Sequence, residues 1–191
     1  MLYTRKGDDG TTSAFNSKKG QRMSKSSCQT ESLGALDELN SFLGLLKVKS
    51  VDISWGLPTQ AGVNGKTLSY IVGWTQDCLF TIQAEVAGAG KTITAEKITE
   101  IEMMVDSAEK ELPPITTFFI SGGTEIAALC DISRTLARKA ERRVVAAVEE
   151  KEIIVSPETL AFLNRLSSLF YVLARLMNHK SGIKEVSPSY H

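Results

Sequence analysis

The sequence predicts an all-α protein built as a five-helix bundle that forms one domain over residues 1–191. Apolar residues recur at steps of three and four in five segments, and Gly, Pro and polar residues separate these segments. No convincing run of strands interrupts this pattern. The 191 residues suit one domain, and a hydrophobic content of 42% can supply a substantial core.

The first helix is predicted over residues 29–49. Its apolar side carries Leu33, Leu36, Leu39, Leu43 and Leu46. A neighbouring stripe carries Asp37, Asn40, Ser41 and Gly44. Because Lys and Glu normally fill a solvated face, these short polar groups and the glycine indicate that something packs closely against the stripe.

Two further helices are predicted after a Gly- and Pro-containing loop at residues 50–67. They span about residues 68–87 and 94–111, and Pro113 with Pro114 ends the second. Two Gly-Lys-Thr tripeptides lie in this region, but Gln60 and Glu85 stand where a P-loop needs its first glycine. A Walker-type NTPase is therefore rejected.

The fourth helix follows the pair Gly122–Gly123, which permits a tight turn. Thr124 is the expected N-cap, and the helical pattern continues to about residue 150. Arg134 and Arg138 lie four residues apart on one face, and Glu141 follows on the same stripe. This pattern predicts a charged site held by a packed helix.

The last helix is predicted over residues 157–180, with Pro157 in its first turn, and residues 181–191 are expected to form a flexible tail. Its polar stripe carries Asn164, Ser168, Tyr171 and Arg175. Tyr171 and Arg175 are interpreted as structural residues. Three helices thus carry polar stripes that one bundle can bury only in part, which favours an oligomer.

The amino-terminal segment, residues 1–27, is dense in Gly, Thr, Asp and basic side chains. Such a segment can turn sharply and direct backbone N–H groups, hydroxyls and cations at a polyphosphate. The alternative that the residue types leave open is a frayed terminus with a turn.

Composition excludes several classes of protein. Lys plus Arg and Asp plus Glu each number 22, so the basic excess of a nucleic-acid or membrane-surface binder is absent. No signal peptide or membrane-spanning run is visible, which predicts a cytoplasmic protein. Cys28, Cys78 and Cys130 are widely spaced and odd in number, which favours reduced thiols over disulfides or a zinc site.

Four motifs together resemble the PduO-type ATP:cob(I)alamin adenosyltransferases. YTRKGDDGTTS at 3–13 resembles that family's TRxGDxGTTS loop, and LGALDELNSFLG at 33–44 resembles xGxVDELNSxxG. FFISGGTEIAALCDISRTLARKAER at 118–142 resembles FILPGGxxxAAxLHxARTxxRRAER. LNRLSSLFYVLAR at 163–175 resembles LNRLSDxLFxLAR, and LFTIQAEVA at 79–87 is a fainter match. The motifs keep the family's order.

The resemblance implies a homotrimer of ferritin-like five-helix bundles with active sites between subunits. It implies transfer of the 5′-deoxyadenosyl group of ATP to the cobalt of cob(I)alamin or another reduced corrinoid, with release of triphosphate. Mg²⁺ would bridge phosphate oxygens, and no set of protein metal ligands is expected. Implied partners are a corrinoid reductase and an adenosylcobalamin-dependent enzyme.

The resemblance also implies roles for individual residues. Its nucleotide loop falls on Thr4, Arg5, Gly7, Asp8, Gly10, Thr11 and Thr12. Lys25 matches a phosphate-binding lysine, and Arg134 and Arg138 match the arginines that clamp ATP. Glu141 and Asn164 match polar residues that line the nucleotide site.

Two more residues complete the expected catalytic set with the two arginines. Asp37 matches a carboxylate that pairs with Arg134 across the subunit interface. Phe119 matches an aromatic residue that crowds the lower face of the corrinoid and displaces its lower ligand. In each case the alternative is structural: Arg134 and Arg138 as interface ion pairs, Asp37–Arg134 as a structural pair, and Phe119 as a core aromatic.

The sequence departs from the family pattern at a few positions. Lys139 replaces a second consecutive arginine, and a lysine lacks the bidentate fork. Cys130, Ser121 and Leu33 replace a common histidine, proline and tyrosine. The Lys139 departure motivates a second hypothesis, a sensor or delivery protein that binds ATP or adenosylcobalamin without turnover. A third is a purely structural helical oligomer.

Overall fold

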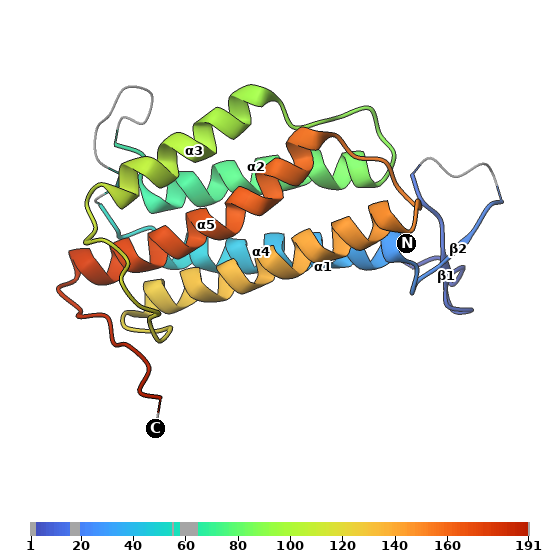
Figure 1. Cartoon of the computed structure of the whole chain (residues 1–191). Coiled ribbons are helices and arrows are strands. Elements are labelled where there is room, and N and C mark those ends of the chain that lie inside the picture. The colour runs from blue at the N-terminus through green and yellow to red at the C-terminus, as the bar shows by residue number, and fades with distance from the viewer. Residues whose placement is uncertain (1–2, 16–19, 55, 58–64, 191) are drawn as a thin grey trace.

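A computed structural model describes residues 3–15, 20–54, 56–57 and 65–190. Over these residues the chain forms five helices, in agreement with the predicted bundle (Figure 1). They are α1 (Cys28–Lys49), α2 (Leu68–Val86), α3 (Ala95–Glu109), α4 (Glu125–Glu149) and α5 (Pro157–Lys180). Part of the predicted loop at 50–67, including Gln60, lies outside the described residues.

Four helices begin at a hydroxyl side chain that accepts a hydrogen bond from a backbone N–H of the first turn. These N-caps are Ser27, Thr67, Thr124 and Ser156. An N-cap satisfies a donor that has no partner inside the helix, so it fixes the residue at which the helix starts. The predicted cap Thr124 is confirmed, and Pro157 occupies the first turn of α5 as expected.

The core is formed where α4 packs against α1 and α5, α1 against α2, and α3 against α5. Its largest fully buried side chains include Leu36, Leu39, Ile82, Ile101, Phe162 and Phe170. The buried side of α4 instead carries small residues, among them Ala127, Ala137 and Ala140. Small residues allow close helix approach, so α4 is held tightly while its opposite face stays available for charged side chains.

The helix α5 is long and apolar enough to cross a membrane by length and composition alone. About two thirds of its apolar stretch is buried inside the bundle. Packing of α5 against α3 and α4 therefore accounts for its apolar character.

The polar stripe of α1 does have a close neighbour, which is α2. Gln76 Nε2 donates to the backbone oxygen of Asn40 at 3.2 Å, and a Cβ added at Gly44 would lie 3.8 Å from the same nitrogen. Asn40 is buried, whereas Asp37 and Ser41 are exposed. The stripe is thus partly covered by the chain itself, and Asp37 remains at the surface.

All three cysteines are free thiols, as predicted. Burial raises the pKa of Cys78 to about 12 and also raises the pKa of the Cys130 thiol. Both thiols are therefore protonated, inert core residues at neutral pH.

The amino-terminal segment contains a short hairpin that the sequence did not indicate. Strand β1 (Thr11–Thr12) pairs antiparallel with β2 (Met23–Ser24). Strands of two residues are too short to show an alternating pattern, so the periodicity of the sequence carried no signal for them. Figure 1 shows this hairpin beyond the end of the bundle at which α1 begins.

Candidate functional site

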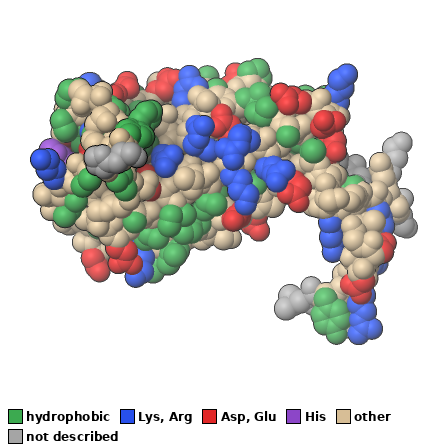
Figure 2. Space-filling view, turned by 60° about the horizontal axis from the view of Figure 1, so that its bottom comes forward, with side chains coloured by type: hydrophobic (Ala, Val, Ile, Leu, Met, Phe, Trp, Pro, Cys, Tyr) green, Lys and Arg blue, Asp and Glu red, His purple; other side chains and the backbone are tan. Residues whose placement is uncertain are grey.

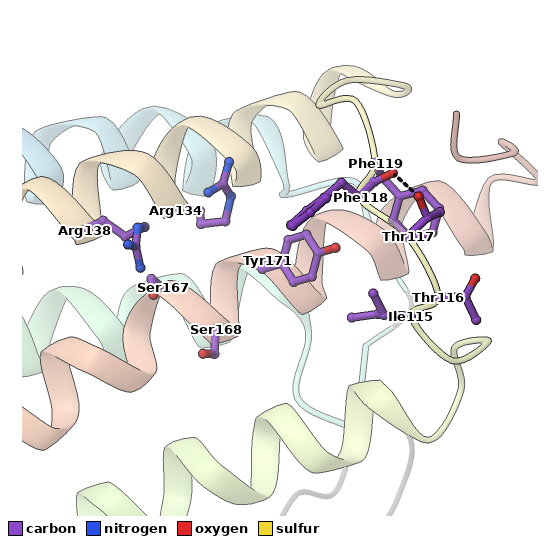
Figure 3. A pocket seen from close by; sticks show the side chains of 10 residues that line it. All are labelled: Ile115, Thr116, Thr117, Phe118, Phe119, Arg134, Arg138, Ser167, Ser168 and Tyr171. Atoms are coloured by element: carbon purple, nitrogen blue, oxygen red, sulfur yellow. Dashed lines mark hydrogen bonds between the residues drawn. The ribbon is translucent and has the colours of Figure 1, made fainter. Parts of the chain in front are cut away.

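The main pocket of the described chain, about 840 Å³, opens between the α3–α4 connection, α4 and α5. We call residues 110–124 the α3–α4 connection. The pocket is lined by Ile115, Thr116, Thr117, Phe118, Phe119, Arg134, Arg138, Ser167, Ser168 and Tyr171 (Figure 3). It therefore combines an aromatic wall from the connection with a cationic wall from α4.

The aromatic wall is unusually exposed to solvent for a group of apolar side chains. Phe118 is 78% exposed and Ile115 is 51% exposed, whereas Phe119 is half-buried. Figure 3 shows Phe118 and Phe119 near the ring of Tyr171 from α5. Exposed apolar side chains that gather at a pocket mark a binding surface, because leaving them in water is unfavourable.

The cationic wall consists of Arg134 and Arg138, one helical turn apart on α4. The Nε atom of Arg134 donates to Asp131 Oδ1 at 3.2 Å, and both side chains are largely buried. Arg138 is exposed, and no ion pair with it is found among the described residues. Arg134 is thus held in place by its own helix, while Arg138 keeps its guanidinium donors available for an anion.

Further along the same stripe, Glu141 and Asn164 meet. Asn164 Nδ2 donates to Glu141 Oε1 at 3.0 Å, which joins the polar side chains of α4 and α5. Figure 2, with the lower side of Figure 1 brought forward, shows Lys and Arg side chains gathered on the middle of this face. Arg134, Arg138 and Glu141 thus share the stripe of α4 that their spacing predicted, and Asn164 of α5 adjoins it through Glu141.

Asp37 and Arg134 form no ion pair within the described chain. Asp37 is exposed on α1, and the ion-pair partner of Arg134 is Asp131. Lys139, the residue that departs from the family pattern, pairs with Glu38 of α1. Lys139 thus ties α4 to α1 and does not line the pocket.

The amino-terminal loop is held in a compact form by contacts of its own. Lys25 Nζ donates to the backbone oxygen of Gly7 at 2.8 Å, and the backbone N–H of Lys25 donates to Gly10 at 3.0 Å. Gly10 has a φ of 78°, a conformation that favours glycine. The structure therefore places the candidate lysine against the glycines of the loop.

Two side chains that the sequence did not single out organise this loop. Asp9 Oδ1 accepts from the backbone N–H of Thr11 at 3.0 Å and from its hydroxyl at 2.7 Å, and these bonds hold the pKa of Asp9 below its usual value. Arg22 donates to the backbone oxygens of Lys6 and Thr11. Thr4, Arg5 and the other expected ligands of a phosphate group remain at or near the surface.

The hairpin lies at one end of the bundle, and the pocket extends from the other end to about the middle of α4 and α5. Figure 1 places β1 and β2 beside the start of α1, whereas the α3–α4 connection lies at the far end, where α4 begins. Figure 2 shows the amino-terminal segment as an arm that projects from the body of the molecule. One chain therefore does not bring its own hairpin to its own pocket.

A buried asparagine fixes the turn before α4. Asn178 Nδ2 donates to the backbone oxygen of Gly122 at 2.8 Å, and Asn178 Oδ1 accepts from the backbone N–H of Thr124 at 3.0 Å. Gly123 has a φ of 101°, and a Cβ there would lie 2.2 Å from Asn178 Oδ1. Glycine is therefore required at this position both by conformation and by space.

The sequence reasoning missed several contributors to the site. Asp131 lies three residues before Arg134, a helical spacing at which an ion pair could have been predicted. Tyr171 was interpreted as structural but lines the pocket. Asn178 contacts residues more than fifty positions away, so no local pattern indicated it.

No group of three or more His, Cys, Asp or Glu side chains suited to hold a metal ion occurs among the described residues. The donors near the arm and the pocket are instead guanidinium, ammonium, hydroxyl and backbone N–H groups. This donor set suits an anion such as a polyphosphate.

Comparison with known proteins identifies the family. The sequence model of cobalamin adenosyltransferase matches residues 2–177. The chain belongs to the cobalamin adenosyltransferase family. It is 36% identical to a corrinoid adenosyltransferase of Bacillus subtilis, over 97% of this chain and 90% of that protein.

Two further proteins are similar to this chain over nearly all of its length. The chain is 36% identical to the corrinoid adenosyltransferase PduO of Salmonella typhimurium, over 99% of this chain but only 54% of that protein. It thus spans about half the length of that relative. A variant PduO-type ATP:corrinoid adenosyltransferase of Lactobacillus reuteri, solved with cobalamin and ATP, superposes with a TM-score of 0.82 at 25% identity. That match covers 98% of this chain and 99% of the other.

Proposed function

We propose that the chain transfers the 5′-deoxyadenosyl group of ATP to the cobalt of a reduced corrinoid, giving adenosylcobalamin and triphosphate. The observation that carries the proposal is the pocket at which exposed aromatic side chains adjoin Arg134 and Arg138. Membership of the cobalamin adenosyltransferase family supports the same reaction.

The aromatic part of the pocket suits a corrinoid. A volume of about 840 Å³ falls in the range of about 300–1,000 Å³ that is typical of small-molecule sites. A corrin ring is broad and largely apolar, and the walls formed by Phe118, Phe119 and Tyr171 offer it matching surface. Phe119 would press on the lower face of the corrinoid and displace its lower ligand, which leaves the cobalt easier to reduce.

The charged part of the site suits the triphosphate of ATP. Arg134 and Arg138 supply forked donors, Lys25 supplies a point charge, and the amino-terminal loop supplies hydroxyls and backbone N–H groups. Glu141 and Asn164 extend the same surface. Mg²⁺ would enter with the phosphates of ATP, because it is commonly bound through phosphate oxygens and water with few protein ligands.

The chemistry needs no nucleophilic side chain, since the reduced cobalt of the substrate is itself a strong nucleophile. A cobalt–carbon bond forms to C5′, the C5′–O bond breaks, and its electron pair leaves on the triphosphate. The protein must hold C5′ in line with the cobalt and stabilise the charge that grows on the leaving group. Arg134, fixed by Asp131, and the exposed Arg138 are suited to the second task.

We propose that the working form is a homotrimer in which each pocket is completed by the arm of a neighbour. The separation of hairpin and pocket in one chain supports this arrangement. Asp37, exposed on α1, is available to pair with Arg134 of an adjacent subunit. We place the protein in the cytoplasm, with a corrinoid reductase supplying cobalt(I) and an adenosylcobalamin-dependent enzyme using the product.

The hypothesis of a sensor without turnover loses its main support. It was motivated by Lys139, and Lys139 pairs with Glu38 away from the pocket. The residue that lacks the arginine fork is thus engaged in an ion pair with α1.

A direct assay tests the proposed function. Protein, MgATP and chemically reduced cobalamin are mixed, and the loss of the cob(I)alamin spectrum is followed together with formation of the cobalt–carbon bond and triphosphate. We expect stoichiometric formation of adenosylcobalamin and triphosphate over many turnovers. Tight binding of both substrates without product would instead establish the sensor.

A further inference from the structure

The carboxyl-terminal segment, residues 181–190, lies against the α3–α4 connection through a buried arginine. Arg175 in α5 is only 3% exposed. Its Nε donates to both carboxylate oxygens of Glu185 at 3.1 Å, and its Nη2 donates to Glu185 Oε2 at 3.0 Å. The sequence predicted a flexible tail over residues 181–191.

The same guanidinium also contacts the aromatic wall of the pocket. Its Nη2 donates to the backbone oxygen of Pro113 at 3.1 Å, and its Cζ lies 5.1 Å from the centre of the Phe119 ring. A cation at this distance from an aromatic face is attracted to it. Arg175 therefore joins the tail, the start of the pocket wall and Phe119 in one cluster.

A second tie lies next to Phe119 in the chain. The backbone N–H of Ile120 donates to the backbone oxygen of Val186 at 2.8 Å. The connection has no helix or strand between α3 and α4, so contacts of this kind determine where its backbone lies. Two contacts thus hold Phe119 in place: Arg175 lies against its ring, and Val186 of the tail binds the backbone N–H of the next residue, Ile120.

We propose that Glu185 and Arg175 position Phe119 for the reaction, so that the carboxyl-terminal segment is a working part of the corrinoid site. Glu185 neutralises a guanidinium that would otherwise be buried without a counter-charge, and it keeps that guanidinium beside the Phe119 ring. Arg175 is a positioning residue, because it acts through Phe119. The inference rests on the proposed adenosyl transfer and on the proposed role of Phe119.

The substitution that tests the inference is Glu185→Gln, which keeps the size of the side chain and removes its charge. Lys184→Gln is the matched control, since it removes a charge from an exposed neighbour in the same segment. Arg175→Lys is a second variant, because it keeps the positive charge but loses the fork that reaches Glu185 and Pro113 together. Each variant is assayed with cobalamin and with cobinamide, which has no lower base to displace.

For Glu185→Gln and Arg175→Lys we expect turnover with cobalamin to fall about tenfold or more, because small displacements at a reacting centre are costly. Turnover with cobinamide should fall much less, and Lys184→Gln should match the wild type with both. An equal loss with both corrinoids, or no loss, would overturn the positioning role.

Hydrogen exchange gives a readout that does not depend on turnover. In Glu185→Gln, the peptide that covers residues 113–120 should exchange its amides faster than in the wild type, whereas Lys184→Gln should leave it unchanged. Unchanged exchange in Glu185→Gln would refute the tie itself. A wild type that transfers nothing to either corrinoid would instead refute the proposed function, which separates the two failures.

Discussion

Mixed oligomers made from two inactive variants test whether a pocket uses the arm of another subunit. Lys25→Ala damages the arm, where Lys25 holds Gly7, and Arg138→Ala damages the pocket. Each variant alone should be nearly inactive, because every site then lacks either the arm or the arginine. In a mixed oligomer, the intact pocket of one variant can meet the intact arm of the other.

The turnover expected of a mixed oligomer can be worked out from the positions of the hairpin and the pocket in one chain. Since the hairpin lies beyond one end of the bundle and contributes no residue to the pocket, each site should draw on two chains (Figure 1). A mixed trimer with head-to-tail contacts then has one intact site of three, so it should regain about a third of the wild-type turnover. A mixed two-fold dimer would regain about a half, and sites built within one chain would regain nothing.

The assay requires that the two variants carry different affinity tags and are co-expressed. Purification over both tags selects mixed oligomers, and turnover is followed by loss of the cob(I)alamin spectrum. Light scattering of the same sample gives the number of subunits. Turnover no higher than that of the separate variants, in oligomers shown to contain both, would refute the proposal that sites are shared between subunits.

Four further predictions concern single positions. Arg134→Ala should lower turnover at least about a hundredfold while the oligomer persists on size-exclusion chromatography, because a donor to the leaving group is lost; unchanged turnover would remove Arg134 from the site. Phe119→Ala should cost more activity with cobalamin than with cobinamide, and equal losses would exclude the displacement role. Gly123→Ala should lower the unfolding free energy by about 2–4 kcal/mol in urea titrations, because the backbone is strained and the Asn178 contacts are lost. In an Asn178→Ala background this cost should be smaller. An equal cost in that background would contradict the proposed clash with Asn178. Burial raises the pKa of Cys78 to about 12, whereas the thiol of the unfolded chain keeps its ordinary pKa of 9.0. Between these values only the unfolded chain loses the proton, so the free energy of unfolding should fall as pH rises above 9.0. Cys78→Ala should reduce this fall, and an unaltered pH dependence in the variant would contradict the burial of the thiol.

The sequence was most informative where local rules decide the structure. The leucines of α1 and the apolar side of α5 recur at helical spacing, and Thr124 and Pro157 mark helix starts, so the boundaries fall within a residue or two of those predicted. The arginines of α4 were readable for the same reason, since residues four apart must share a face.

Such local rules could not predict the contacts that shape the pocket. Asn178 binds Gly122 and Thr124 from another helix, and Glu185 binds Arg175 from a segment with no periodic pattern. Both depend on how α5 packs against the end of α4, which is a tertiary property. The hairpin of the arm was missed because its strands are only two residues long.

The two walls of the pocket are built in different ways, and this difference has a consequence for substrate choice. The cationic wall belongs to α4, whose buried alanines hold it rigidly against the bundle. The aromatic wall belongs to a connection held by separate polar contacts from α5 and the carboxyl-terminal segment. Substitutions in those polar contacts should therefore change which corrinoid is accepted, whereas substitutions of the α4 arginines should slow transfer to every corrinoid alike. Evolution could thus alter corrinoid preference through the tail without disturbing the arginines that meet the triphosphate.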